Sequence, residues 1–195
     1  MKFFIIAVAV LLVMFVAFQI FAMSSRSDIE SYPYEVVKQY DDFEIRQYEA
    51  RLFTSVKVSA ADYKSASSRG FSKLGGYIFG ANDGNEKIAM TSPVTMSLED
   101  SMTMKFMVPK DYKKEDLPTP NESDITFEEE PERLVAAISF GGWANDKKIE
   151  EYKTQLVAAL DEAGVKYNSN FYFYGYNAPY DMIGRKNEVI VELQK

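Results

Sequence analysis

The side chains that most often carry catalysis or bind transition metals are missing from this chain, which contains neither histidine nor cysteine. Their absence excludes zinc sites built from Cys and His, thiolate nucleophiles and every Ser–His or Cys–His catalytic pair. Carboxylates, Lys, Arg, Tyr, Met and Ser remain, and none of them falls into a recognised catalytic spacing. The sequence therefore favours a binding protein over an enzyme, with tyrosine or carboxylate chemistry as the less favoured interpretation.

One loop near the C-terminus combines apolar and basic side chains. Between Asn177 and Lys186 the chain carries Tyr180, Met182 and Arg185. An arginine can bind a carboxylate through two parallel hydrogen bonds while a flat ring lies on the apolar residues beside it. The loop thus suits an amphipathic anion such as a porphyrin with propionates. The structural alternative is that Arg185 caps the end of a sheet or pairs with Glu188.

Methionine and tyrosine form two further groups. Methionines are frequent between residues 90 and 107, and on strands they fill a core more often than they line a ligand pocket or bind iron. The run from Phe171 to Tyr176 places phenylalanines on one face of a strand and tyrosines on the other. Those tyrosines need hydrogen-bond partners, either water or the rim of a ligand site. The GANDG loop at residues 80–84 lacks a calcium-binding ladder and predicts a turn.

The elements that must position these residues fall into two similar halves. Alternation of period two predicts strands, and apolar residues at spacings of three and four predict helices. The first half has a hairpin (34–40 and 43–48), a strand with one buried face (51–59), a helix (62–79) and two strands (88–98 and 102–108). The second half has a strand (133–140), a helix (146–163) and two strands (170–176 and 188–193), after a surface connection (109–131) with an edge strand at 125–127. We predict an α+β fold of duplicated βαββ units that form a twisted antiparallel sheet or distorted barrel with two flanking helices.

The helices carry further signals. Ser59 and Asp62 form a predicted capping box before the first helix, and Asn145 and Gly164 suit the N- and C-terminal caps of the second. The first helix also contains glycines at positions 70, 75 and 76, each of which costs up to about 1 kcal/mol relative to alanine. Such a cost indicates close approach of the sheet or of a ligand to that helix.

The N-terminus is strongly apolar. Residues 3–23 contain Gln19 as their only polar side chain, and as a helix they are long enough to cross a bilayer. Lys2 precedes the run, which favours an N-terminus inside and a domain outside the cytoplasm, in a periplasm or lumen. The alternative is a signal peptide cleaved at Ala22-Met23-Ser24, which would leave a secreted domain. We expect a transmembrane anchor or signal peptide at 1–23, a linker at 24–31 and one domain at 32–195.

The overall composition narrows the class of partner. The chain has 195 residues, 47% of them hydrophobic, so it can bury a substantial core. Its formal charge of −7 disfavours binding to DNA or RNA. A hydrophobic small molecule and a membrane remain as expected partners.

Three ordered motifs resemble the SOUL/haem-binding protein family: KIAMTSPV at 87–94, FGGWA at 140–144 and GYNAPY...GRKNEVIVEL at 175–193. The resemblance extends from about Tyr34 to the C-terminus and implies a pseudo-symmetric pair of βαββ units. It also implies a shallow cleft for haem or another tetrapyrrole between the first helix and the loop before the last strand. In this chain the cleft residues would be Arg69, Phe71, Leu74 and Gly75 on the helix, and Tyr180, Met182 and Arg185 on the loop.

The chain departs from the family at the iron ligand. Some members are thought to use a histidine near the first helix, and this chain has none. Haem would then be held without a strong protein ligand, or through Tyr77, Tyr180 or Met182. The expected function is a membrane-tethered, non-catalytic tetrapyrrole-binding or carrier protein. The alternative is a receptor for another hydrophobic small molecule, or a protein-interaction module, at the membrane.

Overall fold

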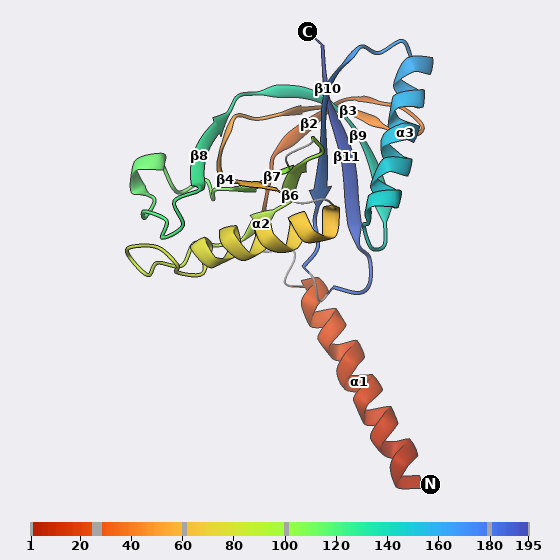
Figure 1. Cartoon of the computed structure of the whole chain (residues 1–195). Coiled ribbons are helices and arrows are strands. Elements are labelled where there is room, and N and C mark those ends of the chain that lie inside the picture. The colour runs from red at the N-terminus through yellow and green to blue at the C-terminus, as the bar shows by residue number, and fades with distance from the viewer. Residues whose placement is uncertain (1, 25–28, 60–61, 100–101, 179–180, 195) are drawn as a thin grey trace.

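The computed structural model describes residues 2–24, 29–59, 62–99, 102–178 and 181–194. Within these residues the chain is α+β, with three α-helices, a nine-stranded antiparallel sheet curled into a half-barrel and a separate parallel pair of short strands (Figure 1). The α+β class and the antiparallel sheet confirm the prediction from the sequence.

The large sheet has the order β2-β3-β9-β11-β10-β6-β7-β4-β8. In chain order its strands are β2 (Tyr34–Gln39), β3 (Glu44–Tyr48), β4 (Arg51–Val58), β6 (Val94–Ser97), β7 (Met102–Met107), β8 (Ile125–Glu130), β9 (Arg133–Gly141), β10 (Tyr167–Gly175) and β11 (Lys186–Leu193). The parallel pair is β1 (Glu30–Ser31) and β5 (Thr91–Ser92), so the last residues of the expected linker form a strand. A short 3-10 helix, η1 (Lys114–Asp116), lies in the connection before β8, and β8 is the edge strand expected there.

The duplication of the βαββ unit is confirmed by the topology. The first unit is β4-α2-β6-β7 and the second is β9-α3-β10-β11, with α2 at Tyr63–Ile78 and α3 at Asp146–Glu162. In the sheet, β4-β7-β6 from one unit meets β10-β11-β9 from the other, so corresponding strands lie in mirrored order around the β6–β10 contact. The two halves therefore share one continuous sheet.

The ends of the two helices agree with the sequence except at one cap. Asn145 is the N-cap of α3, where its Oδ1 accepts a hydrogen bond from the backbone N–H of Lys148 (3.0 Å), and Gly164 has a positive φ of 65° just past the last turn. The capping-box prediction for α2 was wrong. Asp62 is itself the N-cap, with an extended backbone, and its Oδ1 accepts from the N–H of Ser65 (2.8 Å).

The face of the sheet that the helices cover is apolar. Leu156 and Leu160 of α3 pack on Phe173, Val189 and Val191 of the sheet. Leu74 of α2 packs in the same way with Val56, Met96, Met104 and Phe106. The prediction that most of the methionines fill the core is therefore confirmed for this face.

Gly70 explains how α2 approaches the sheet so closely. A Cβ atom at Gly70 would lie 3.0 Å from both Cβ and Sδ of Met104 on β7. At Gly76 the nearest side-chain atom, Cβ of Ala81, would be 3.9 Å away, an ordinary contact. Of the two causes expected for the glycines of this helix, the sheet accounts for Gly70.

The opposite face of the sheet is also buried, although no helix covers it in the described part of the chain. Tyr32, just before β2, packs on Tyr48 of β3 and Phe53 of β4, with ring centroids 4.5 and 5.2 Å apart. These two strands lie near opposite ends of the sheet, so its curl closes this face on itself. The prediction that β4 has only one buried face was therefore wrong, since Phe53 and Ser55 are buried as well as Thr54 and Val56.

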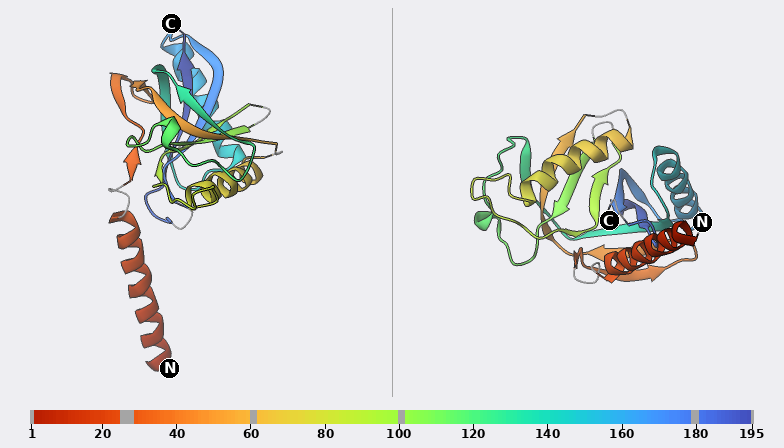
Figure 2. Two further views of the ribbon diagram at one scale, coloured as in Figure 1. Left: turned by 90° about the vertical axis from the view of Figure 1, so that its left-hand side faces the viewer. Right: turned by 90° about the horizontal axis from the view of Figure 1, so that it is seen from below.

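The helix α1 (Lys2–Ser24) extends away from the rest of the chain (Figures 1 and 2). Its large apolar side chains from Phe3 to Phe18 are 44–89% exposed. Searching the described residues for a helix with the length and apolar character of a membrane span finds none.

Candidate functional site

The loop that joins β10 to β11 is fixed by its own polar groups. Arg185 donates from Nη1 to the carbonyl oxygens of Ala178 (2.9 Å) and Asp181 (2.7 Å). The N–H of Lys186 donates to Oδ1 of Asn177 (2.6 Å), which closes the base of the loop. Arg185 is therefore engaged in shaping the loop at this end of the sheet, and the cations that the described residues place at Glu188 are Arg46 and Lys186.

Trp143 forms the second wall of this region. It lies in the turn between β9 and α3, and Nδ2 of Asn187 ties that turn to β11 by donating to the carbonyl of Gly142 (2.8 Å). The guanidinium of Arg185 lies over the indole ring, 4.0 Å from its centroid. This cation–π contact joins the β10–β11 loop to the β9–α3 turn.

The start of α2 reaches the same region. The N–H of Tyr63 donates to Oδ1 of Asp146 in the first turn of α3 (2.7 Å), and the Tyr63 ring packs edge-on against Phe173 at 5.0 Å. Burial raises the pKa of Tyr63, and the nearby charge of Arg185 partly offsets that rise. The two helix starts and the β10–β11 loop thus converge at one end of the sheet.

The residues predicted for the cleft are spread along α2. Arg69 is exposed and donates from Nη1 to the carbonyl of Ser59 (3.1 Å), while Phe71 packs against Phe106. Leu74 is fully buried in the core under α2, and Gly75 is buried beside the ring of Phe71. The helical rise places Phe71 and Leu74 roughly 12 to 17 Å beyond Tyr63 along the helix.

The loop residues of the predicted cleft lie at the start of α2 instead. Arg185 interacts electrostatically with Tyr63, and Met182 is 57% exposed. Tyr180 lies outside the described residues. Tyr77, one of the side chains considered for iron, is in the core and donates its hydroxyl proton to the carbonyl of Pro118 (3.0 Å).

Sequence reasoning missed Trp143 as a candidate site residue. With Met182 and Ile183 it forms a set of large apolar side chains that are 53%, 57% and 55% exposed, beside Arg185. The available signal was the single tryptophan of the chain, in the FGGWA motif after a strand. We call Trp143, Met182 and Ile183 the Trp143 patch.

The tyrosine face of β10 has partners that the sequence did not identify. Tyr176 donates to Oε2 of Glu188 (2.6 Å), and Tyr172 donates to Oε1 of Glu192 (3.2 Å). Tyr174 is fully buried and bonded to Arg133. Burial raises the pKa of Tyr174 well above its ordinary value, with Arg133 acting in the opposite direction. These partners are protein groups, neither water nor a ligand rim.

Glu188 is the centre of a buried ionic network. Arg46 binds its carboxylate through two hydrogen bonds of 2.9 and 3.0 Å, and Ser139 donates to it at 2.8 Å. Lys186 lies 3.0 Å away. Burial by itself would raise the pKa of Glu188, but the bonds and charge of Arg46 outweigh it and lower that pKa. The carboxylate is satisfied, which argues for a structural role.

Two hollows of the described residues lie away from the predicted cleft. An enclosed cavity of about 10 Å³ beside Tyr77 has room for one water at most. An open groove of about 540 Å³ lies between β4, β8 and η1, lined by residues such as Leu52, Tyr112, Lys113 and Glu129. A drug-sized ligand usually occupies a pocket of roughly 300–1,000 Å³.

The residues present fit a tetrapyrrole in part. The Trp143 patch offers an apolar surface, with a guanidinium at its edge. Histidine ligation is impossible, and the described residues contain no group of three His, Cys, Asp or Glu placed to hold a metal ion. These residues therefore match the apolar ring of a tetrapyrrole and its carboxylates.

Several proteins with similar sequences are named for heme binding. The family model described as SOUL heme-binding protein matches residues 29–192. "Heme-binding protein 2" of Mus musculus and that of Homo sapiens are each 34% identical over 166 residues, covering 80% of this chain and 80% of each relative. "Heme-binding protein 1" of Xenopus laevis is 30% identical over 156 residues, covering 75% of this chain and 81% of the relative.

Solved structures show a similar fold at low sequence identity. The C-terminal domain of EcmrR superposes with a TM-score of 0.61 at 14% identity, covering 83% of this chain and 98% of that domain. A structure described as a hydrolase from Listeria innocua gives a TM-score of 0.53 at 10% identity, covering 81% of this chain and 94% of its own. These likenesses concern the fold alone.

Proposed function

This chain belongs to the SOUL heme-binding protein family, and from that premise we propose that it binds haem or another tetrapyrrole without catalysing a reaction on it. The observation that carries the proposal is the family match over nearly the whole domain, together with 34% identity to proteins named for heme binding. When bound, the tetrapyrrole would supply the iron and redox chemistry. The chain's own residues would bind and orient the ring.

We place the ring at the end of the sheet where α2, α3 and the β10–β11 loop converge. The Trp143 patch would contact one face of the ring, and Arg185 would face a propionate. Met182 and Tyr180 are the candidate iron ligands from the loop, and Arg69 and Phe71 would contact the ring only if it extends along α2. Leu74 and Gly75 would support the helix from inside the core.

A haemin titration of residues 29–195 tests this proposal. This fragment contains all of the residues of the three buried core clusters, to which α1 contributes none of its described side chains. We expect a saturable shift of the Soret band, with affinity reduced at least several-fold by Arg185→Ala. A response that never saturates would contradict the proposal.

Lys113→Ala is the matched control. Lys113 lines the groove between β4 and β8, where a porphyrin could also meet a cation. We expect this variant to bind haemin like the unaltered fragment. If Lys113→Ala weakens haemin binding and Arg185→Ala does not, the haemin site lies in that groove.

The alternative function is a receptor for another hydrophobic small molecule or a protein-interaction module. Its motivation is the missing histidine. A thermal-shift screen separates the possibilities, because a ligand that binds the folded state raises the melting temperature, and the rise grows with the ratio of ligand concentration to Kd. A rise with other apolar ligands and none with porphyrins would favour the alternative.

We also propose that the apolar N-terminus tethers the domain to a membrane, with the domain outside the cytoplasm in a periplasm or lumen. The support is the apolar run of residues 3–23 and the exposure of the large apolar side chains of α1. The full chain should stay in the membrane pellet after carbonate extraction, whereas residues 29–195 should be extracted. A cleaved signal peptide would instead yield a secreted domain that begins near Ser24.

A further inference from the structure

The Trp143 patch lies where α1 meets the domain. The N–H of Met182 donates to Oε1 of Gln19 near the C-terminal end of α1 (3.4 Å), and Gln19 is buried there. Two perpendicular views show α1 leaving the domain beside the β10–β11 loop (Figures 1 and 2). The exposed apolar surface of α1 therefore continues onto the domain at this loop.

The patch has the chemistry of the bilayer interface. Tryptophan is enriched at the level of lipid headgroups, where its apolar ring and polar N–H meet suitable surroundings. Met182 and Ile183 supply apolar contact beside it, and Arg185 supplies positive charge near headgroup phosphates. Three exposed side chains are far fewer than the roughly 20 to 30 residues that each partner contributes to a stable protein–protein interface.

We propose that the Trp143 patch is seated in the interfacial layer of the membrane that holds α1. This inference rests on the proposed tether and adds a second contact to it, at a fixed place on the domain. With two contacts the sheet has a defined orientation on the membrane. The candidate tetrapyrrole site then faces the lipid, and a tetrapyrrole that enters it from the bilayer takes the place of lipid against the patch.

The depth of Trp143 in the membrane can be measured directly, because it is the only tryptophan of the chain. The full chain is reconstituted into phosphatidylcholine vesicles whose acyl chains carry bromine either near the headgroup or near the bilayer centre. We expect blue-shifted Trp143 fluorescence, quenched at least twofold more strongly by the shallow bromines than by the deep ones. Equal and negligible quenching by both lipids would overturn the inference.

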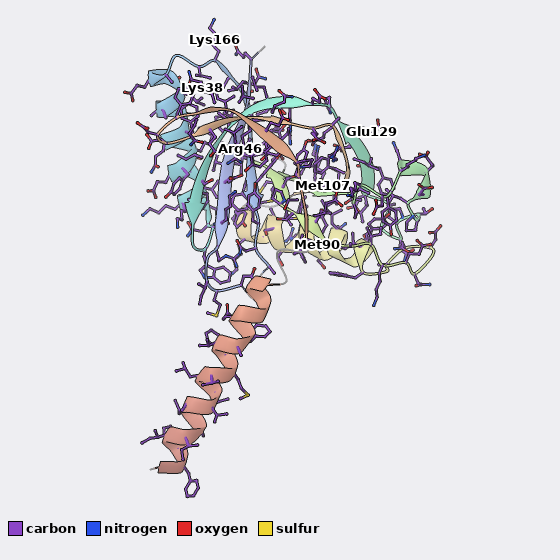
Figure 3. The ribbon with its side chains drawn as sticks, turned by 180° about the vertical axis from the view of Figure 1, so that it is seen from behind. Lys38, Arg46, Met90, Met107, Glu129 and Lys166 are labelled. Atoms are coloured by element: carbon purple, nitrogen blue, oxygen red, sulfur yellow. The ribbon has the colours of Figure 1, made fainter. Side chains whose placement is uncertain are left out.

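A relocated probe gives the matched control. Lys166 is exposed and lies at the end of the domain opposite α1 (Figure 3). In the variant Trp143→Phe/Lys166→Trp the fluorescence should show no quenching by either lipid. Quenching at this position equal to that at Trp143 would contradict a specific seat for the patch.

A second variant tests the apolar contact itself. Met182→Glu/Ile183→Glu places two carboxylates in the patch, and their desolvation should lift Trp143 away from the lipid and reduce the quenching at least twofold. Flotation of the vesicles separates the two proposals. A chain that floats without quenching contradicts only the patch, whereas a chain that does not float contradicts both the tether and the patch.

Discussion

The two faces of the sheet are buried by different means. Under α2 and α3 the contacts are made by aliphatic side chains, methionines and phenylalanines. On the opposite face tyrosines surround two ionic networks, Arg46–Glu188 and Arg133–Glu130–Glu192. A helix can present an apolar stripe to a sheet, whereas a sheet that curls onto itself brings long polar side chains together and must pair them.

The two faces of the sheet therefore differ in how a substitution destabilises them. Removing methyl groups from the helix-covered face creates a cavity, and its cost depends on how far the neighbours relax. Removing one charge from the opposite face leaves its partner buried without compensation. The second face is therefore the more sensitive to a change that keeps shape and alters charge.

Glu188→Gln should have the largest effect. The amide that replaces the carboxylate has nearly the same shape, but Arg46, only 3% exposed, would keep Glu44 (2.7 Å) and lose its pair with Glu188, so we expect a loss of up to about 3–5 kcal/mol in the free energy of unfolding. Urea denaturation of residues 29–195 measures it. The double variant Arg46→Met/Glu188→Leu should recover most of the loss. A single variant within about 1 kcal/mol of the unaltered protein would show that the network is solvated.

Leu156→Ala tests the helix-covered face. Leu156 of α3 is fully buried against the sheet, and its truncation should cost about 2–5 kcal/mol. Leu134→Ala is the control of the same chemistry, because Leu134 is 36% exposed and should lose less than about 1 kcal/mol. Equal losses in the two variants, measured by the same denaturation, would contradict the assigned burial.

Gly70→Ala should lower the stability by a smaller amount, whereas its control, Gly76→Ala, should raise it. The new methyl group would meet Met104 at 3.0 Å, and overpacking of this kind costs about 1–3 kcal/mol. Gly76→Ala meets only an ordinary contact and should stabilise the helix by up to about 1 kcal/mol. Thermal unfolding separates the pair, and a stable Gly70→Ala variant would show that α2 can shift away from β7.

Lowering the pH should produce the smallest of these differences in stability between the two faces. The pKa of Glu188 is lowered in the folded state, so its contribution to stability is present above its ordinary pKa of 4.5 and is lost as the pH falls below that value. Arg46→Met/Glu188→Leu has no such carboxylate and should lose less stability between pH 5 and pH 3. Parallel acid profiles of the two proteins would contradict the assigned pKa direction.

Much of the fold was predictable because it follows from local periodicity. The hairpin, both helices, the edge strand and the duplicated order are confirmed by the structure. One face of β4 was wrongly predicted to be exposed. Ser55 on that face is buried because the sheet curls and brings strands distant in sequence over it, which no local pattern in the sequence indicates. Arg46 and Glu188 were missed as a pair for the same reason, since charged residues are rarely buried and these two are 142 residues apart.

The candidate site was predicted less well than the fold. The β10–β11 loop was recognised from its residue types, but the contact of Arg185 with Trp143 depends on two loops that only the fold brings together. The residues assigned to α2 came from family resemblance, and the helix places Leu74 inside the core. The need of the tyrosine face for partners was stated correctly, although the partners proved to be arginine and glutamate.

The chain passes from β3, second in the sheet, to β4, eighth in the sheet, through only Glu49 and Ala50. Each of these strands then pairs with partners far along the sequence: Tyr48 lies opposite Arg133, and Phe53 lies opposite Met107. Strands so far apart in the sequence can pair only after a long loop has closed. The entropy cost of closing that loop slows folding to milliseconds or longer. A newly made chain can pair β3 with β2 at once, but the other edge of β3 stays unpaired until β9 in the second half has been synthesised, a period in which that edge is open to aggregation.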